Sequence, residues 1–422
     1  MNKASIIGAY NTKFGAFVEK NRETGEVRDT KSFYDLLEEA GRGAIEDAGI
    51  SAKEIDGIWI GSCSPSKFIN QEHVAPLGLE VAPEDLMFVP ATRTEAACAS
   101  SSIALYNAAF AIESGRFKRV LVIGVEKMNL LATKDVTHVL ACSSFWPDEG
   151  ASGMTFPGLF AELAKGYMAH HKYSLGQMQK MFAHISALSY KNGYENPLAH
   201  FGKGALPYQL GLDDPEKILN LPESGKGSNP MIAYPLRLHD CSLVSDGAAA
   251  LVLAPAGDAK KLSARAVEIA GIGMASDRLA EKKRSNLYEL TAGKMAVKKS
   301  FGEAGITIAD VDFAEVHDCF SINQILTTEA LGLSKDGQAG FDYINKKFEP
   351  EDSCPVNLSG GLKAKGHPVG ATGASMHALA YKQLVGEPIG LTPGKKNPEI
   401  GVVFNVGGSG ATNCVTTLKR IK

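Results

Sequence analysis

Two cysteines and two histidines in this sequence have the types and neighbours expected of nucleophilic and acid–base chemistry. Cys98 lies in the run AACASSS (residues 96–102), directly before a helical pattern. A cysteine in the first turn of a helix faces free backbone N–H groups and the positive end of the macrodipole, which lowers the thiol pKa and favours the thiolate nucleophile. Its small neighbours leave space for a substrate. The alternative is that Cys98 is a small buried hydrophobic residue, as free cysteines often are.

His317 and Cys319 belong to the sequence HDCF, which follows an apolar run expected to be a strand, residues 311–316. Strand ends are where α/β folds place reactive groups. Residues two apart on an extended chain point to the same side, so the pair can offer a hydrogen-bond donor and a thiol acid/base to one site. A core cysteine beside a histidine bonded to the backbone explains the pattern equally well.

His367 lies in a glycine-rich stretch, residues 359–374, just before a helix expected at 375–384. Glycines let the backbone approach a ligand closely, and a histidine there suits a base or an oxyanion donor beside a thioester. Lys363 and Lys365 could meet phosphates, but we interpret them as solvated surface charges. The stretch is not a P-loop, because a His-Pro pair stands where a P-loop has Lys followed by Ser or Thr.

The last glycine-rich stretch, NVGGSGA (residues 405–411), follows the apolar run 400–404. Such a turn can cradle a phosphate, and it can equally be a simple tight turn. The triplet HDC at residues 239–241 is interpreted as structural. Three further cysteines are expected to be buried: Cys142, Cys354 and Cys414.

The composition is that of an ordinary globular enzyme, with 44% hydrophobic and 22% charged residues over 422 positions. A formal net charge of −3 gives no reason to expect nucleic acid or an anionic membrane as a partner. No apolar run approaches the roughly 18 residues of a membrane span, and the N-terminus is expected to be a first strand. The seven cysteines are scattered without a CxxC pair, which argues against a disulfide framework or a zinc ribbon. We therefore expect a cytoplasmic protein without a metal site of its own.

Strand-like apolar runs alternate with helical patterns, which is typical of an α/β fold. Strands are expected at 5–9, 58–61, 120–125, 248–253, 311–316 and 400–404, and helices at 33–48, 98–114, 160–170, 175–190 and 375–384.

The second half of the chain repeats the first. Residues 48–51, Asp56 and Cys63 match residues 304–307, Asp312 and Cys319 at one constant offset. A repeat of this length indicates two related halves packed together. We expect an N-terminal half at 1–260 and a C-terminal half at 261–422. Residues 129–237, with their aromatic clusters and turn signals, are expected to form a loop domain inserted in the first half.

Taken together, AACASSS, HDCF, the GHP at residues 366–368, the following GATG and the final glycine-rich loop resemble the thiolase superfamily. The match is to the branch of the thiolase domain of sterol carrier protein and its archaeal and bacterial relatives. VEKM at 125–128 and SDGAA at 245–249 fit as well, and the resemblance covers nearly the whole chain. It implies two βαβαβαββ halves in a layered α-β-α-β-α arrangement with an inserted loop domain.

The resemblance also implies the chemistry, a reversible thio-Claisen reaction of a 3-oxoacyl-CoA. Cys98 would carry the acyl group, His367 would activate Cys98 and help form an oxyanion hole, His317 would hold the thioester oxygen, and Cys319 would move the α-proton. No metal or redox cofactor is needed, since coenzyme A is a substrate or product. Residues expected to bind the CoA substrate are Ser359, Gly360, Gly408, Ser409 and Gly410.

One position departs from many thiolases, which carry their acid/base cysteine as Cys-x-Gly in the last loop. Here that place holds Asn405, and in the branch with HDCF the cysteine comes from that motif instead, which favours Cys319. The family further implies a dimer or a dimer of dimers. Relatives in this branch also work with a small zinc-ribbon and OB-fold partner subunit, so any zinc would belong to that partner.

Three rival functions remain at this point. The loop domain has enough aromatic and methionine side chains to line a broad pocket for a substrate such as benzoylsuccinyl-CoA, and it could equally be packing its own core. A noncatalytic acyl-CoA or lipid-binding scaffold would not need the four reactive residues. A ketoacyl synthase would have no reason for Cys319. The loop side chains in question are Phe145, Trp146, Phe156, Phe160, Tyr167 and Met168.

Overall fold

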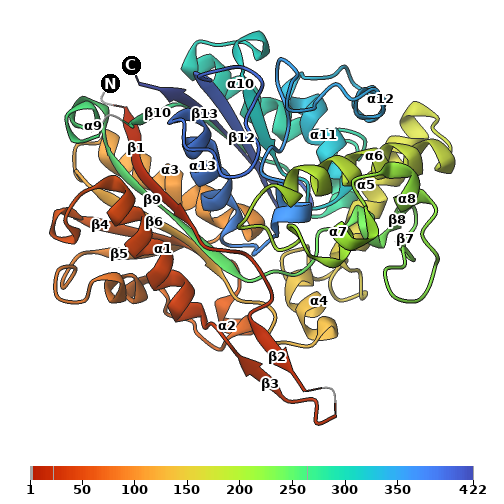
Figure 1. Cartoon of the computed structure of the whole chain (residues 1–422), viewed down its shortest axis with the longest axis horizontal. Coiled ribbons are helices and arrows are strands. Elements are labelled where there is room, and N and C mark those ends of the chain that lie inside the picture. Colours follow the sequence, from red (N-terminus) through yellow and green to blue (C-terminus); the bar gives the residue numbers. More distant parts are fainter. Residues whose placement is uncertain (1–2, 22, 264, 422) are drawn as a thin grey trace.

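Strands from both halves of the chain join in one sheet in the computed structural model, which describes residues 3–21, 23–263 and 265–421 (Figure 1). Across these residues the strand order is β11-β12-β13-β10-β1-β9-β6-β4-β5. Strands β1 (Ala4–Asn11) and β10 (Val267–Ser276) meet in the middle, with Ser5 opposite Glu268. The remaining strands of the sheet are β4 (Gly57–Gly61), β5 (Ala91–Thr94), β6 (Val120–Glu126), β9 (Gly247–Pro255), β11 (Phe313–Val316), β12 (Ile400–Gly407) and β13 (Thr412–Arg420).

Helices cover both outer faces and fill the space between the two half-sheets. Helix α1 (Phe33–Ala48) packs on β1, β6 and β9, and α10 (Thr291–Ala304) packs on β10 and β13. Between the half-sheets lie α3 (Ser100–Glu113) and α13 (Thr372–Leu384), which contact each other and strands of the first half (Figure 1). The α-β-α-β-α layering expected from the sequence is therefore confirmed.

The repeat is visible in local hydrogen bonding. Helices α1 and α10 both end at a glycine in the left-handed region, Gly49 with φ 66° and Gly305 with φ 65°. The matched aspartates act alike, because each accepts from two backbone N–H groups at the start of a distant strand. Asp56 accepts from Lys118 and Arg119 before β6, and Asp312 accepts from Glu399 and Ile400 at β12.

Glycines in the first strand of each half allow a helix to lie close. A Cβ on Gly8 would lie 2.4 Å from the backbone nitrogen of Ala48 at the end of α1. A Cβ on Gly271 would lie 2.1 Å from the carbonyl oxygen of Ser300 on α10. This close approach explains why a glycine recurs in the opening strand of both halves.

The expected insertion lies between β6 and β9. It packs against the C-terminal half through α5 and α6, which contact α11. Its elements are α4 (Thr133–Ala141), α5 (Phe156–His171), α6 (Leu175–Tyr194), α7 (Leu206–Leu210), α8 (Pro215–Leu219), β7 (Met231–Ala233) and β8 (Leu236–Arg237). Elsewhere the chain forms β2 (Val18–Lys20), β3 (Val27–Asp29), α2 (Pro65–Phe68), α9 (Ala256–Leu262), α11 (Ser321–Leu331) and α12 (Ala339–Ile344). Within the described ranges, no helix is both long and apolar enough to cross a membrane.

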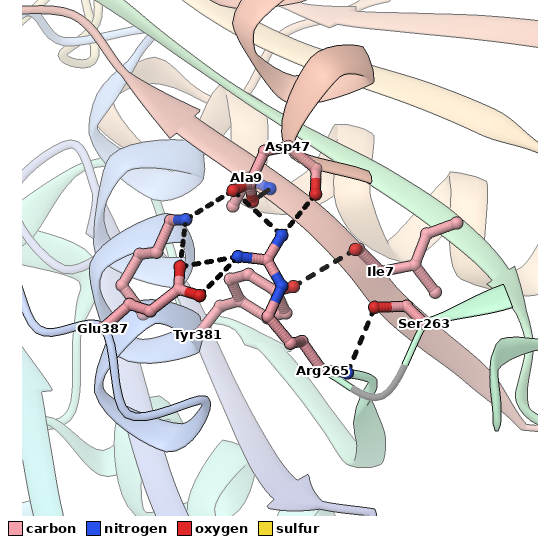
Figure 2. Close-up of polar contacts among 8 residues, drawn as sticks. Ile7, Ala9, Asp47, Ser263, Arg265, Tyr381 and Glu387 are labelled. Carbon is pink, nitrogen blue, oxygen red and sulfur yellow. Dashed lines mark hydrogen bonds and ion pairs between the residues drawn. The ribbon is translucent and has the colours of Figure 1, made fainter. Parts of the chain in front are cut away.

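A network of charged side chains ties the two halves together (Figure 2). Asp47, near the end of α1, accepts from the backbone N–H of Ala9 at 2.8 Å, from Arg265 at 3.1 Å and from Lys382 on α13 at 2.6 Å. Glu387 pairs with the same two cations. One carboxylate of the first half thus holds two cations of the second.

Candidate active site

A largely apolar cavity of about 150 Å³ lies where loops of the two halves meet, and Cys98, Cys319 and His367 line it. The sulfur of Cys98 and ring nitrogens of His317 and His367 all lie within 4.8 Å of one another. The structure therefore brings together the four reactive side chains singled out in the sequence.

Cys98 lies in a 3-10 turn, Ala97–Ala99, that links β5 to α3. Ala97 has φ 50°, a left-handed conformation that is unusual for a residue with a Cβ and is characteristic of strained functional turns. A Cβ on Gly61 of β4 would lie 2.3 Å from the Cα of Ser101 at the start of α3. Glycine at position 61 therefore lets the helix that follows the turn lie directly on the sheet.

The expectation of a lowered Cys98 pKa is wrong. Burial raises the pKa of the Cys98 thiol to about 12, although the backbone N–H groups of Gly408 and of Cys98 itself favour the thiolate. Desolvation of the charged sulfur outweighs these dipoles. Cys98 is thus a thiol at neutral pH and needs a base to take its proton.

His367 has the geometry of such a base. It follows a π-helical turn, Gly361–Lys365, and precedes α13. The hydroxyl of Thr372 donates to the carbonyl oxygen of Pro368 at 3.0 Å, so it accepts from Nδ1–H of His367 at 2.7 Å. Nε2 then carries the lone pair. Burial, with the nearby charge of Lys365, lowers the pKa of His367 to about 3 and keeps the ring neutral.

His317 lies at the end of β11, with its ring edge to face with that of His367. The side-chain nitrogen of Asn405 lies 2.9 Å from Nδ1 of His317. The other ring nitrogen, Nε2, is buried and has no hydrogen-bond partner among the described residues. Burial lowers the pKa of His317 well below its ordinary value, so this ring is neutral too. Asn405 was noted in the sequence only as a departure, and its contact with His317 was not foreseen.

Cys319 lies between His317 and the start of α11. Burial raises the pKa of the Cys319 thiol well above its usual value, and the neighbouring Cys98 adds to the effect. The backbone carbonyl of Cys319 accepts from the N–H of Ser242 at 2.8 Å. Cys241 lines the cavity because residues 241 and 320 pair, and the interpretation of the HDC triplet as structural stays a prediction.

The residues expected to bind CoA separate into two groups. Gly408 lines the cavity, and the neighbouring Ser409 accepts from Arg284 through its carbonyl and its hydroxyl oxygens at 2.7 and 3.2 Å. Gly410 follows in the same turn. Ser359 instead donates to Glu315 at 2.6 Å, and Gly360 lies against Gly193 of α6. The structure does not bring Ser359 and Gly360 to the cavity lining.

Two interpretations of single residues are wrong. Lys363 and Lys365 are not surface charges, since they are only 3% and 0% exposed. Lys363 donates to the carbonyl of Cys241 at 2.8 Å, and Lys365 donates to Ser375 at 3.0 Å. Burial lowers the pKa of both, that of Lys363 to about 8. Glycine-rich flanks suggested an exposed loop, but the loop is buried between α6 and β11. Cys142, expected to be buried, is half-exposed beside Lys67.

The rest of the lining is largely apolar, with Thr137 and Ser242 among its members, and it carries no lysine or arginine among the residues described. The thiol of Cys98 with two imidazoles is also a donor set that soft metal ions accept. Further lining side chains are Met128, Val136, Leu140, Phe156, Leu243, Val244, Phe320 and Val369.

Known proteins resemble the chain over its full length. The family description "Thiolase, N-terminal domain" matches residues 4–257, and "Thiolase C-terminal domain-like" matches residues 273–420. An acetyl-CoA acetyltransferase from Methanothermobacter thermautotrophicus is 37% identical over 423 residues, covering 100% of both chains. Sterol carrier protein 2 from Rattus norvegicus is 30% identical over 430 residues, covering 99% of this chain and 71% of that protein.

Among solved structures, the Ltp2-ChsH2(DUF35) aldolase has a TM-score of 0.78 at 19% identity and covers 99% of this chain and 98% of that chain. That likeness shows the fold alone. The sequence matches, together with the layered halves, confirm the resemblance drawn from the motifs: the chain belongs to the thiolase family, in the branch of the archaeal acetyl-CoA acetyltransferases and sterol carrier protein 2.

Proposed function

We propose that the chain is an acyl-CoA C-acyltransferase that cleaves or forms a 3-oxoacyl-CoA through an acyl group on Cys98. The observation that carries this proposal is the proximity of one thiol to two neutral imidazoles. The Cys98 sulfur and one ring nitrogen each of His317 and His367 lie within 4.8 Å of one another, beside a buried cavity. The named activity of the full-length archaeal relative supports the same reaction class.

In the cleavage direction, Nε2 of His367 takes the proton of Cys98 and the sulfur attacks the 3-oxo carbonyl. The bond between the α-carbon and the 3-oxo carbon breaks, and its electrons move onto the thioester carbonyl. His317 holds the resulting enolate oxygen. Cys319 gives its proton to the α-carbon, which releases acetyl-CoA. The thiol of coenzyme A then gives its proton to the Cys319 thiolate and takes the acyl group, and the released Cys98 thiolate recovers its proton from His367. None of these steps uses a metal or a redox cofactor.

The lining favours an uncharged acyl group. A carboxylate in this cavity would be buried without a cation, which is strongly unfavourable. Of the six loop side chains considered for an aromatic pocket, only Phe156 lines the cavity, and Phe160 and Tyr167 belong to the core. The benzoylsuccinyl-CoA alternative therefore lacks support in the lining.

Two features support an assembly with other chains. Strand β5 is an edge of the sheet with partly exposed residues, which suits pairing with a second copy in a homodimer or a dimer of dimers. The structural neighbour named Ltp2-ChsH2(DUF35) aldolase includes a second protein in its name, which supports a small partner subunit of the zinc-ribbon and OB-fold kind.

The test is thiolysis of acetoacetyl-CoA by coenzyme A, in which the decrease of acetoacetyl-CoA is measured over time. Wild-type protein should turn over, and Cys98→Ala should lose at least about 1,000-fold in kcat, as expected for removal of a nucleophile. Cys142→Ala is the matched control, because Cys142 is half-exposed and does not line the cavity. Tight binding of acyl-CoA without turnover, unchanged in Cys98→Ala, would instead favour the noncatalytic scaffold.

A further inference from the structure

The side chain of Asn405 occupies the end of β12, where the motif of many thiolases has a cysteine. It is fully buried between α3 and the end of β11. The hydroxyl of Ser102 lies 2.7 Å from Oδ1 of Asn405, and Nδ2 of Asn405 lies 2.9 Å from Nδ1 of His317. The side chains of Ser102, Asn405 and His317 thus form one continuous series of hydrogen bonds.

The direction of these hydrogen bonds determines which ring nitrogen of His317 carries the proton. The side-chain hydroxyl of Ser102 makes no other hydrogen bond among the described residues, so its proton is satisfied only by donation to Oδ1 of Asn405. The amide of Asn405 then presents N–H to His317, and Nδ1 must be the lone pair. The ring proton is left on Nε2, which is buried and has no hydrogen-bond partner among the described residues. One ring nitrogen of His317 lies within 4.8 Å of the Cys98 sulfur and of a ring nitrogen of His367.

A flipped side-chain amide of Asn405 would reverse the direction of both hydrogen bonds in this series. Oδ1 of Asn405 would accept from Nδ1–H of His317, and the hydroxyl proton of Ser102 would have no acceptor within the described part of the chain. An unmade hydrogen bond of a buried group costs about 1–3 kcal/mol. Donation from Ser102 to Asn405 and from Asn405 to His317 is therefore the more stable arrangement.

His367 is held the opposite way. Thr372 accepts from its Nδ1–H, which leaves Nε2 as a lone pair. One ring thus offers a base to the cavity, while the other offers an N–H donor.

We propose that Asn405, oriented by Ser102, is a positioning residue that fixes His317 in the Nε2–H tautomer, so that His317 donates a hydrogen bond to the substrate's thioester oxygen. This inference rests on the proposed function. Asn405 replaces a cysteine that would itself have moved a proton, and its amide lets a neutral histidine act as the oxyanion donor.

The direct test is nitrogen NMR of protein labelled with ¹⁵N-histidine, with His317→Gln used to assign the signal. Wild type at pH 8.5 should show His317 protonated on Nε2. In Asn405→Asp the carboxylate can only accept, so the proton should move to Nδ1. A wild-type His317 protonated on Nδ1 would overturn the proposal.

Kinetics of the two half-reactions provide a readout that a merely structural role would not change. In Asn405→Asp at pH 8.5, transfer of acetyl from acetyl-CoA to Cys98 should stay within about threefold of wild type, because His367 and Gly408 are untouched. Formation of acetoacetyl-CoA from the acetylated enzyme should fall about 100-fold, as for loss of one oxyanion donor. Equal losses in both half-reactions would contradict the proposal.

Asn229→Asp is the matched control, since Asn229 is equally buried but hydrogen-bonds only to backbone groups of Ile218 and His239. It should change neither tautomer nor the ratio of the two half-reactions. If Asn405→Asp does not fold, the wild-type NMR signal still decides the tautomer. If wild type forms no acyl-enzyme, the proposed function fails, and the tautomer measurement stands independently of it.

Discussion

His317 and His367 lie edge to face, with ring centroids 5.2 Å apart and planes at 84°, and both have a ring nitrogen beside the sulfur of Cys98. They come from different parts of the fold, the end of β11 and the loop before α13. Both rings are neutral because burial lowers the pKa of each. Their roles therefore differ through hydrogen bonding rather than charge: Thr372 leaves a lone pair on one, and Asn405 leaves a proton on the other.

The first prediction concerns pH. The pKa of His367 is lowered to about 3, so acylation of Cys98 should lose no rate to protonation of this ring between pH 8 and pH 5. Rapid-quench measurement of acyl-enzyme formation from acetyl-CoA checks this. A single-proton loss of rate centred near pH 6.5 would contradict it. Because the folded state holds the ring neutral, His367 should also reduce the free energy of unfolding as pH falls from about 6.5 toward 3.

The second prediction separates Cys319 from Cys98. Cys319→Ala should still become acylated by acetyl-CoA, but it should lose about 100- to 10,000-fold in formation of acetoacetyl-CoA, as for loss of a positioned acid/base. Exchange of acetyl-CoA α-hydrogens with deuterated water should be lost as well. Cys241→Ala removes another thiol from the same lining and should stay within about tenfold of wild type. Exchange that persists in Cys319→Ala would exclude it as the proton carrier.

The third prediction concerns the acyl group. Acetyl-CoA should load Cys98, and succinyl-CoA should not, because its carboxylate would enter a lining without lysine or arginine in the described chain. Val136→Lys, which places a cation on that lining, should allow some loading by succinyl-CoA. Efficient loading of wild type by succinyl-CoA would show that the acyl group lies elsewhere.

The fourth prediction concerns the contact between halves (Figure 2). Asp47→Asn should lower the free energy of unfolding by about 1–3 kcal/mol, because Arg265 and Lys382 share this partly buried carboxylate. Chemical denaturation measures the change. Glu19→Gln is the control, because Glu19 pairs with Arg28 on the surface, where their side chains are 65% and 69% exposed, respectively. The expected change in the free energy of unfolding is within about 0.5 kcal/mol. Equal effects would show that the network does not hold the halves.

Hydrophobic periodicity was sufficient to predict several elements of the fold, although Cys98 lies in a 3-10 turn before α3 and not in the expected helix 98–114. Helix α1 has the predicted bounds, and the expected strands at 58–61, 120–125 and 400–404 lie within β4, β6 and β12. The repeat also matched Asp56 with Asp312, which make equivalent hydrogen bonds to the backbone. These features depend on local patterns, which the sequence displays directly.

Burial and long-range polar contacts were not predictable in the same way. Lys363 and Lys365 have the types of surface residues, and only the packing of α6 and β11 around their loop makes them internal. The Cys98 pKa depends on the balance between desolvation and a few N–H dipoles, which requires coordinates. Asn405 reaches His317 from the neighbouring strand, which is distant in sequence, and only its place in the usual cysteine position marked it.

Intact-protein mass spectrometry after incubation with acetyl-CoA tests the central claim most directly. Wild type should gain one acetyl group, the gain should map to the peptide that contains Cys98, and Cys98→Ala should gain none. Free coenzyme A should remove the acetyl group. An adduct that persists in Cys98→Ala, or a wild type that turns over acetoacetyl-CoA with no adduct at Cys98, would contradict the account.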